Sequence, residues 1–269
     1  MLQFRFAAET DTGLVRDHNE DSAFAGPYLL AVADGVGGQA AGEVASATTT
    51  YVVSALALAH PGTEPLGLLQ SSIEASRTQV HAGVEADPSR RGMATTLTAI
   101  LTDGLRFGLA HVGDSRAYLL RDGGLHQLTH DHTLVQALVD TGRITPEEAA
   151  EAPMRHVVLQ AIDGDSVPTP DLVWLDLREG DRLLLCSDGL TDLVSDADIL
   201  QLLGVSSRRL ATTGLVRAAL DAGGRDNVTC VVADLVDAEP IVGNGQLIGA
   251  ARDLGNVVDP AHVRPVRSA

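Results

Sequence analysis

The 269-residue sequence contains no lysine, so all 19 of its basic side chains are arginines. With 36 acidic residues, the formal net charge at pH 7 is −17. Proteins that bind nucleic acids usually present a basic stripe to the phosphate backbone, and this chain has none. The composition argues against DNA and RNA as partners, and any fixed cation that holds an oxyanion must be an arginine or a metal ion.

The chain is also poor in cysteine and in long apolar runs. Cys186 and Cys230 lie within apolar stretches and lack CxxC spacing, which indicates two buried reduced thiols rather than a disulfide or a zinc site. The apolar runs are much shorter than the roughly 20 residues of a membrane helix, and the first ten residues lack the hydrophobic segment of a signal peptide. We therefore expect a cytoplasmic protein with no membrane partner.

Hydrophobic residues make up 45% of the chain, which is enough for a substantial core. Neighbouring strand-like runs favour antiparallel pairing, and Asp103-Gly104 and Asp122-Gly123 each have the composition of a type I′ hairpin turn. Seven runs rich in Val, Leu, Ile and Thr predict strands at 28–33, 94–102, 105–112, 116–121, 172–177, 182–187 and 227–235.

Apolar positions three and four residues apart predict helices over 44–58 and 66–84, and we expect further helices near 196–203 and 208–222, between the last two strands. Strand runs and helix pairs without strict alternation predict an α+β domain, an antiparallel β-sandwich flanked by helix layers.

We expect one domain over residues 1–237. Its insert at about 130–171 has no strand pattern, but "TPEE" from Thr145 has the composition of a helix N-terminus. Residues 238–269 lose periodicity and are interpreted as a mobile C-terminal extension.

Acidic residues gather at the ends of the strand-like runs. A single Asp-Gly is most simply a turn, but several acids at strand ends on one edge of a sandwich would crowd into one cleft. Only multivalent cations would hold them ionised together, and oxygen ligands select Mg²⁺ or Mn²⁺ over zinc. Apolar runs end at Asp34, Asp114 and Asp188, and Asp226 precedes another such run. Glu20 and Asp192 complete this set of six acids.

Seven motifs follow one another between about residues 4 and 236: "TGLVRDHNEDS", "ADGVGG", "GMATTLTAIL", "HVGDSRAYLLRDG", "LTHDHT", "CSDGLTD" and "RDNVT". In this order they resemble the metal-dependent protein phosphatases (type 2C, PPM), specifically the bacterial serine/threonine branch. The resemblance implies the α-β-β-α fold of that family. It also implies hydrolysis of phosphoserine and phosphothreonine in proteins, reversing a bacterial Ser/Thr kinase.

By this resemblance, Asp34 bridges two ions, either Mn²⁺ or Mg²⁺. Glu20 and the carbonyl of Gly35 bind one ion, and Asp188 and Asp226 bind the other. Two ions of this kind can hold and acidify a bridging water for in-line attack on phosphorus, without a phosphoenzyme.

The resemblance also assigns residues around the two ions. Arg16 binds the substrate phosphate through its forked guanidinium, and Asp21 and Asn227 lie next to the ligands. Asp114 and Asp192, together with Asp188, bind a third, weaker ion. The alternative for these two acids is that they cap turns or bind backbone amides.

The sequence departs from animal members of the family at Val36, where they carry a histidine proposed to protonate the leaving alkoxide. Bacterial members commonly lack that histidine too, and a metal-bound water is the preferred donor. The insert at 130–171 corresponds to the family's flap beside the active site. We expect structural roles for Arg116, paired with a neighbouring acid, and hydrogen-bonding or surface roles for His130 and His132.

Three other functions stay open. The chain could be a phosphatase acting on a small regulator of a stress or sporulation pathway, or an inactive module that binds phosphoproteins. A calcium-binding structural module is a third, but "DGDS" at 163–166 lacks the rest of a calcium loop. The favoured interpretation is a monomeric phosphatase whose partners are phosphorylated proteins and a cognate Ser/Thr kinase.

Overall fold

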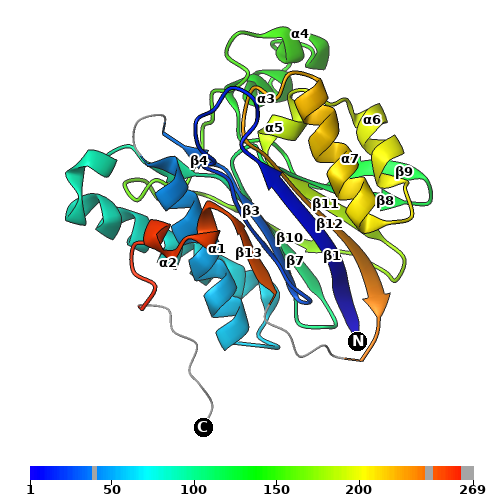
Figure 1. The fold of residues 1–269 in the computed structure, drawn as a ribbon, viewed down its shortest axis with the longest axis horizontal. Coiled ribbons are helices and arrows are strands. Elements are labelled where there is room, and N and C mark those ends of the chain that lie inside the picture. Colours follow the sequence, from blue (N-terminus) through cyan, green and yellow to red (C-terminus); the bar gives the residue numbers. More distant parts are fainter. Residues whose placement is uncertain (38–40, 240–244, 262–269) are drawn as a thin grey trace.

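Two antiparallel sheets pack face to face in the computed structural model, which describes residues 1–37, 41–239 and 245–261 (Figure 1). In spatial order, the five-stranded sheet contains β1 (Leu2–Asp11), β12 (Val228–Asp237), β11 (Arg182–Cys186), β8 (Arg116–Arg121) and β9 (Gly124–Gln127). The six-stranded sheet contains β10 (Asp171–Leu175), β7 (Phe107–Val112), β6 (Leu97–Thr102), β3 (Leu29–Ala33), β2 (Ser22–Ala25) and β13 (Gln246–Gly249). A short pair, β4 (Gly35–Val36) and β5 (Ala94–Thr95), lies beyond the end of β3.

Helices cover the outer face of each sheet. The helices α1 (Gly42–Ala59) and α2 (Pro65–Ala86) pack on the six-stranded sheet. On the five-stranded sheet lie α5 (Asp188–Thr191), α6 (Asp196–Leu203) and α7 (Arg208–Asp221). The order of layers is α-β-β-α, as predicted. Within the described residues, no helix combines the length and the apolar character needed to cross a membrane.

The central core lies between the two sheets, where side chains from both inner faces meet. Phe4, Leu183 and Val231 of one sheet pack with Leu30 and Ile100 of the other, and all five are almost fully buried. Alternation along each strand sends every second side chain into this layer and the others toward the helices. The two sheets are therefore held together by a shared apolar core.

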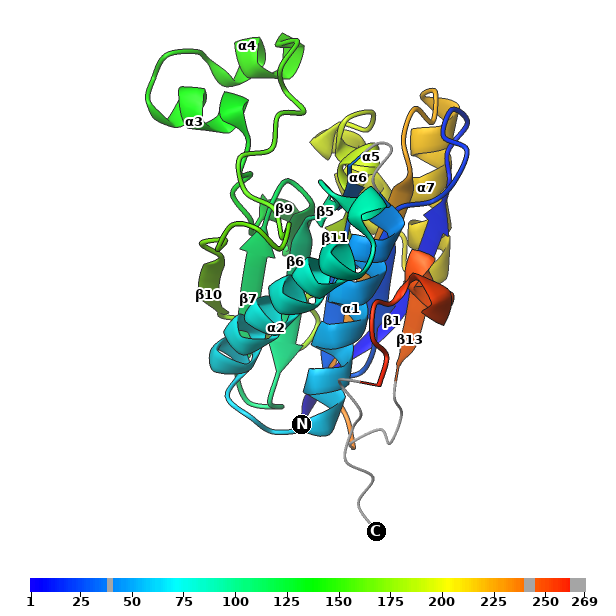
Figure 2. The ribbon, with the colours of Figure 1, turned by 90° about the vertical axis from the view of Figure 1, so that its left-hand side faces the viewer.

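The predicted insert forms a separate lobe at one end of the sandwich. It contains α3 (Leu134–Asp140) and α4 (Pro146–Glu151), which stand beyond the ends of the strands in Figure 2. The N-cap Thr145 accepts from the Glu148 amide, and the Glu148 side chain accepts from the Thr145 amide, so both halves of a capping box are present. We refer to residues 130–170, up to the start of β10, as the flap.

Of the two predicted type I′ hairpin turns, the structure confirms one and contradicts the other. Asp122 and Gly123 have φ of 52° and 79°, as a type I′ turn requires. At Asp103-Gly104 only the glycine has a positive φ, and the Asp103 carboxylate accepts from the amides of Leu105 and Arg106. The type I′ prediction is wrong there, because the connection is a longer loop closed by the aspartate side chain.

The two cysteines are free and buried, as predicted. They lie side by side on neighbouring strands, since Cys186 of β11 is the register partner of Cys230 of β12.

The expectation of a mobile extension from residue 238 does not hold for residues 245–261. Here β13 pairs with β2 at the edge of the six-stranded sheet, and Ile248 enters the core between the sheets. Two 3-10 turns follow, η2 (Ala250–Arg252) and η3 (Leu254–Asn256), and pack against α1. Residues 240–244 and 262–269, which also belong to that expectation, lie outside the described residues.

Candidate metal centre

The strand ends predicted to share an edge do meet at one end of the sandwich. Asp34 follows β3 of the six-stranded sheet, Asp188 follows β11 and Asp226 precedes β12 of the five-stranded sheet. Residues that were predicted to bind metal or phosphate all line one pocket there: Arg16, Glu20, Asp34, Gly35, Asp114, Asp188, Asp192 and Asp226.

Hydrogen bonds to its backbone hold Asp34 in place. Its amide donates to Thr96 Oγ1 (2.9 Å), and its carbonyl accepts from the Thr96 amide and from Thr95 Oγ1, both at 2.9 Å. The next residue, Gly35, lies so close to α1 that a Cβ would be 2.5 Å from the carbonyl oxygen of Gly42. Only glycine fits at this position, and the close approach fixes where the Gly35 carbonyl lies.

Ser187, the residue before Asp188, belongs to a buried chain of hydrogen bonds. Ser187 Oγ donates to Asp21 Oδ2 (2.6 Å) and accepts from the Thr229 amide (3.0 Å). Asp21 itself is fully buried, and among the described residues its Oδ1 atom has no hydrogen-bond partner. Asp21 therefore lies behind the pocket, in contact with the residue that precedes Asp188.

Asn227 joins the loop before β2 to the start of β12. Its Oδ1 accepts from the Glu20 amide (2.8 Å), and its Nδ2 donates to the carbonyls of Thr12 and His18. Its own amide donates to Asp226 Oδ1 (2.8 Å). Asn227 thus contacts Glu20 through its side chain and Asp226 through its backbone amide, which links the two acids.

Burial and mutual repulsion make the carboxylates unfavourable as bare anions. Burial, and then the neighbouring acids, raise the pKa of Asp34 well above its ordinary value, that of Asp188 to about 6 and that of Asp114 to about 8. Burial likewise raises the pKa of Glu20. Divalent cations would remove both penalties, and an all-oxygen donor set suits Mn²⁺ and Mg²⁺. The residues present therefore fit the metal ions that the sequence predicts.

Arg16 reaches the rim of this pocket. Its Nη2 lies 2.7 Å from Asp226 Oδ2, and its side chain is 46% exposed. This hydrogen bond is the first cause that raises the pKa of Arg16. Arg155 and Arg225 also line the pocket, whereas Val36 offers no proton donor.

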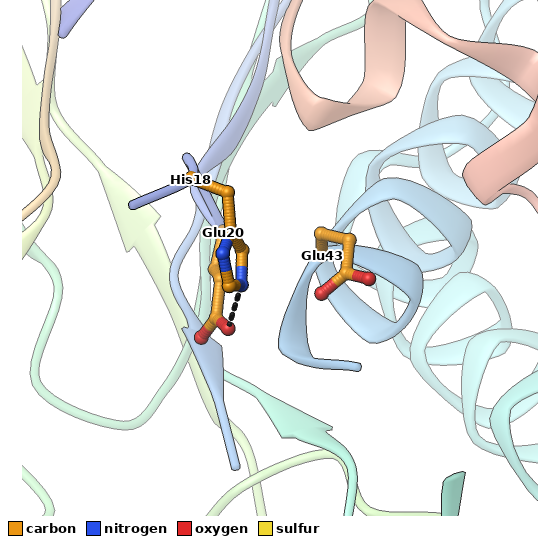
Figure 3. Close-up of side chains that lie close together, drawn as sticks. All are labelled: His18, Glu20 and Glu43. Carbon is orange, nitrogen blue, oxygen red and sulfur yellow. Dashed lines mark hydrogen bonds and ion pairs between the residues drawn. The ribbon is translucent and has the colours of Figure 1, made fainter. Parts of the chain in front are cut away.

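His18 and Glu43 were not predicted, and they surround Glu20. His18 Nε2 lies 2.9 Å from Glu20 Oε1, and Glu43 points toward the pair from α1 (Figure 3). One ligand atom from each of the three lies within 4.8 Å of the others. His18 sits two residues before Glu20 in "RDHNED", which is the only sequence signal that could have found it.

His156 of the flap was missed as well. Its Nδ1 lies 3.1 Å from Asp192 Oδ2, so the flap contacts a predicted ligand of the third ion. The segment around His156 has no apolar periodicity, and nothing in the sequence links it to the acids.

Three structural roles predicted from the sequence are confirmed. Arg116 forms a forked pair with Asp131, with Nε to Oδ1 at 2.9 Å and Nη2 to Oδ2 at 2.6 Å. His130 pairs with Asp140 at 2.8 Å, and His132 Nδ1 accepts from the Gly113 amide at 3.2 Å.

Comparisons with known proteins point to one family. The family model of protein phosphatase 2C matches residues 15–222. The serine/threonine protein phosphatase PstP of Mycobacterium tuberculosis (strain H37Rv) is 52% identical over 236 residues, which are 88% of this chain and 46% of PstP. Protein phosphatase PhpP of Streptococcus pneumoniae (strain R6) is 36% identical over 239 residues, covering 84% of this chain and 95% of PhpP. This chain thus spans about half the length of PstP.

A solved structure shows the same fold. The crystal structure of the catalytic domain of PstP in complex with two manganese ions superposes with a TM-score of 0.83 at 51% identity. The match covers 88% of this chain and all of that chain.

Proposed function

This chain belongs to the protein phosphatase 2C family, and on that premise we propose that it hydrolyses phosphoserine and phosphothreonine in proteins, using two Mn²⁺ or Mg²⁺ ions. The observation that carries the proposal is the meeting of Asp34, Asp188 and Asp226 in one pocket with Arg16 at its rim. The manganese ions of the PstP catalytic domain and the phosphatase names of the relatives support it.

Five residues would hold the two ions. Asp34 would contact both ions. Glu20 and the Gly35 carbonyl would bind one ion, and Asp188 and Asp226 would bind the other. When bound, such ions act as Lewis acids that activate water and stabilise charge on the transferring phosphoryl group. The protein's own part is to keep these oxygens in fixed positions.

Asp114 and Asp192 would bind a third, weaker ion. Both line the pocket beside Asp188, and burial raises the pKa of Asp192 as it does that of Asp114. Neither residue is needed to complete the set around the first two ions.

Arg16 would bind the substrate phosphate. Its guanidinium is half-exposed and already in the pocket, paired with Asp226. A phosphate group offers two oxygens in the geometry that a guanidinium fork matches. Val36 lines the pocket without a proton to give. A water molecule held at the metal centre would therefore supply the proton to the leaving serine or threonine oxygen.

The same family membership supports a proposal about the biological setting. We propose that the chain acts in bacterial signal transduction in the cytoplasm, as a monomer that reverses a cognate Ser/Thr kinase on its protein substrates. Which phosphoproteins it meets depends on the surface around the pocket, including the flap.

A peptide assay tests the proposed activity. Phosphoserine, phosphothreonine and phosphotyrosine peptides are incubated with Mn²⁺ and with chelator, using the wild type, Asp226→Asn and the control Asp122→Asn. Asp122 is an exposed turn residue paired with Arg178, and asparagine tolerates its positive φ.

We expect Mn²⁺-dependent release of phosphate from phosphoserine and phosphothreonine, and a loss of at least about a hundredfold in Asp226→Asn only. Full turnover in chelator would contradict the metal centre. Binding of the peptides without turnover would instead identify a phosphoprotein-binding module.

A further inference from the structure

Two exposed aliphatic side chains lie next to the proposed phosphate-binding residue. Leu14 and Val15, which directly precede Arg16, are 69% and 67% exposed. Their loop connects β1 to β2 and lies beside the turn between α7 and β12, at the end of the sandwich that carries the pocket (Figures 1 and 2). A single exposed aliphatic residue is ordinary on a protein surface, but an adjacent pair beside a ligand pocket is a candidate contact surface.

Hydrogen bonds hold this loop against the turn before β12. The Leu14 amide donates to the carbonyl of Gly224 (2.7 Å). Gly13, with a φ of 81°, lies so close to the turn that a Cβ would be 2.3 Å from the carbonyl oxygen of Asp226. The Asn227 side chain adds two hydrogen bonds to carbonyls of the same loop. The loop backbone is therefore held in place, and a partner binds it without having to order it first.

Arg225 extends the same surface with a positive charge. The residue is exposed and lines the pocket, one position before Asp226. Among residues 1–37, 41–239 and 245–261, no acid forms an ion pair with Arg225. Leu14 adjoins this turn, since a Cβ at Gly224 would be 2.9 Å from Leu14 Cγ. The surface thus combines two aliphatic side chains with a guanidinium that can bind an anion.

This surface is continuous with the phosphate pocket. Leu14 and Val15 lead directly into Arg16. Arg225 leads directly into Asp226, whose Oδ2 lies 2.7 Å from Arg16 Nη2. A phosphorylated residue bound by Arg16 would bring the neighbouring residues of its own chain onto the surface. The occupant that fits is therefore the segment that flanks the phosphate, with an aliphatic side chain for the apolar pair and a carboxylate for Arg225.

We propose that Leu14, Val15 and Arg225 form a docking surface for the substrate segment next to phosphoserine or phosphothreonine. The surface favours substrates that carry an aliphatic and an acidic residue beside the phosphorylated one. The inference rests on the proposed function and adds to it a sequence preference, which the metal centre and Arg16 do not supply.

The test measures kcat/KM on three phosphothreonine peptides. The residues on both sides of the phosphothreonine are leucine and glutamate in the first, leucine and lysine in the second, and glycine and glutamate in the third. Because both sides match, the result does not depend on the direction in which the peptide binds. Assays at an ionic strength of about 0.15 M limit the long-range effect of the net charge.

Two variants and one matched control are compared. The variants are Arg225→Ala and a double serine variant that combines Leu14→Ser with Val15→Ser. The control replaces both Arg209 and Leu210 by alanine. These are an exposed arginine and a 64% exposed leucine on α7, and neither lines the pocket.

We expect the wild type and the control to prefer glutamate to lysine by about threefold to tenfold, and leucine to glycine by a similar factor. Arg225→Ala should lose the preference for glutamate and keep that for leucine, whereas the double serine variant should do the reverse. A variant that lowers kcat/KM equally on all three peptides would show a merely structural role and overturn the inference. Equal kcat/KM of the wild type on all three would also overturn it and leave the proposed function standing. A wild type that hydrolyses none of them in Mn²⁺ would overturn both.

A second copy of the chain is the alternative occupant of this surface. Sedimentation velocity of the wild type and of the double serine variant tests for it. We expect both to sediment as monomers. A wild-type dimer that dissociates in the double serine variant would assign the surface to self-association and overturn the inference.

Discussion

Arg16 is paired with a proposed metal ligand, not with an unrelated surface acid. The pair joins Arg16 Nη2 to Asp226 Oδ2 at 2.7 Å at the mouth of the pocket. The guanidinium is therefore already oriented toward the place where a phosphate would bind. Its replacement should affect substrate capture before it affects the fold.

We expect Arg16→Ala to raise KM and to lower kcat/KM by about tenfold to a hundredfold, the range for losing a charged hydrogen bond. Steady-state kinetics on a phosphothreonine peptide measure this. Arg209→Ala serves as the control, since Arg209 is exposed on α7. A wild-type KM in Arg16→Ala would contradict the proposal that Arg16 binds the substrate phosphate.

His111 is a pH-sensitive residue that lies outside the pocket. It is fully buried, with Nδ1 2.9 Å from Thr98 Oγ1 and Nε2 3.0 Å from the carbonyl of His130. Burial, and then the neighbouring His132, lower the pKa of His111 to about 4. The folded state therefore favours the neutral imidazole.

Because the folded pKa is below the unfolded value of about 6.5, this contribution to stability is present above pH 6.5 and is lost as the pH falls toward 4. We expect the loss to approach about 3 kcal/mol. Urea unfolding of the wild type and of His111→Gln from pH 7.5 to 4.5 measures it, since other titrating groups cancel in the difference. Parallel stability curves would show that His111 does not titrate in this way.

At the residue scale, the sequence reveals the acids of the site but not the side chains that approach them. Asp34, Asp188 and Asp226 can be predicted because each adjoins an apolar strand in a recognisable motif. Glu43 and His156 cannot, because their positions depend on how α1 and the flap pack against the sheets. That packing leaves no local pattern in the sequence.

At the scale of elements, buried strands and long helices are the parts that the sequence predicts well. The run at 116–121 coincides with β8, and the helix near 196–203 coincides with α6. In contrast, β1 is half-buried at the edge of its sheet, so its residues do not form an apolar run. The strand β13 has four residues, and its structure comes from pairing with β2.

We expect Ile248→Ala to lower the free energy of unfolding by about 2–4 kcal/mol, because it leaves a cavity between the sheets. Ile248 is 5% exposed and packs in the central core. Leu254→Ala is the matched control, an exposed aliphatic residue in the same segment. Chemical denaturation of both variants decides the matter, and equal small losses would mean that β13 adds little to the sandwich.

At the scale of the whole molecule, the metal centre spans the two sheets. Asp34 comes from the six-stranded sheet, whereas Asp188 and Asp226 come from the five-stranded sheet. Ions bound by all three would therefore join the layers at one end. Without bound ions, the carboxylates of the two sheets repel one another at this end of the sandwich.

We expect Mn²⁺ at 100 times its dissociation constant to stabilise the fold by about 2.7 kcal/mol per independent site, and to raise Tm by several degrees. Scanning calorimetry in chelator and in Mn²⁺ provides the measurement, with Asp226→Asn as the variant in which the rise shrinks. The same Tm in chelator and in Mn²⁺ would mean that no ion links the sheets.

The net charge of −17 acts over longer distances than any side chain in the pocket. An acidic phosphoprotein would be repelled during its approach and attracted only at contact, where Arg16, Arg155 and Arg225 line the pocket. Since the Debye length shortens to about 8 Å at physiological ionic strength, salt removes the repulsion before it weakens the contact. Encounter with acidic substrates should quicken as salt is added to dilute buffer, while encounter with basic substrates slows. Ionic strength would therefore change the relative encounter rates of acidic and basic substrates.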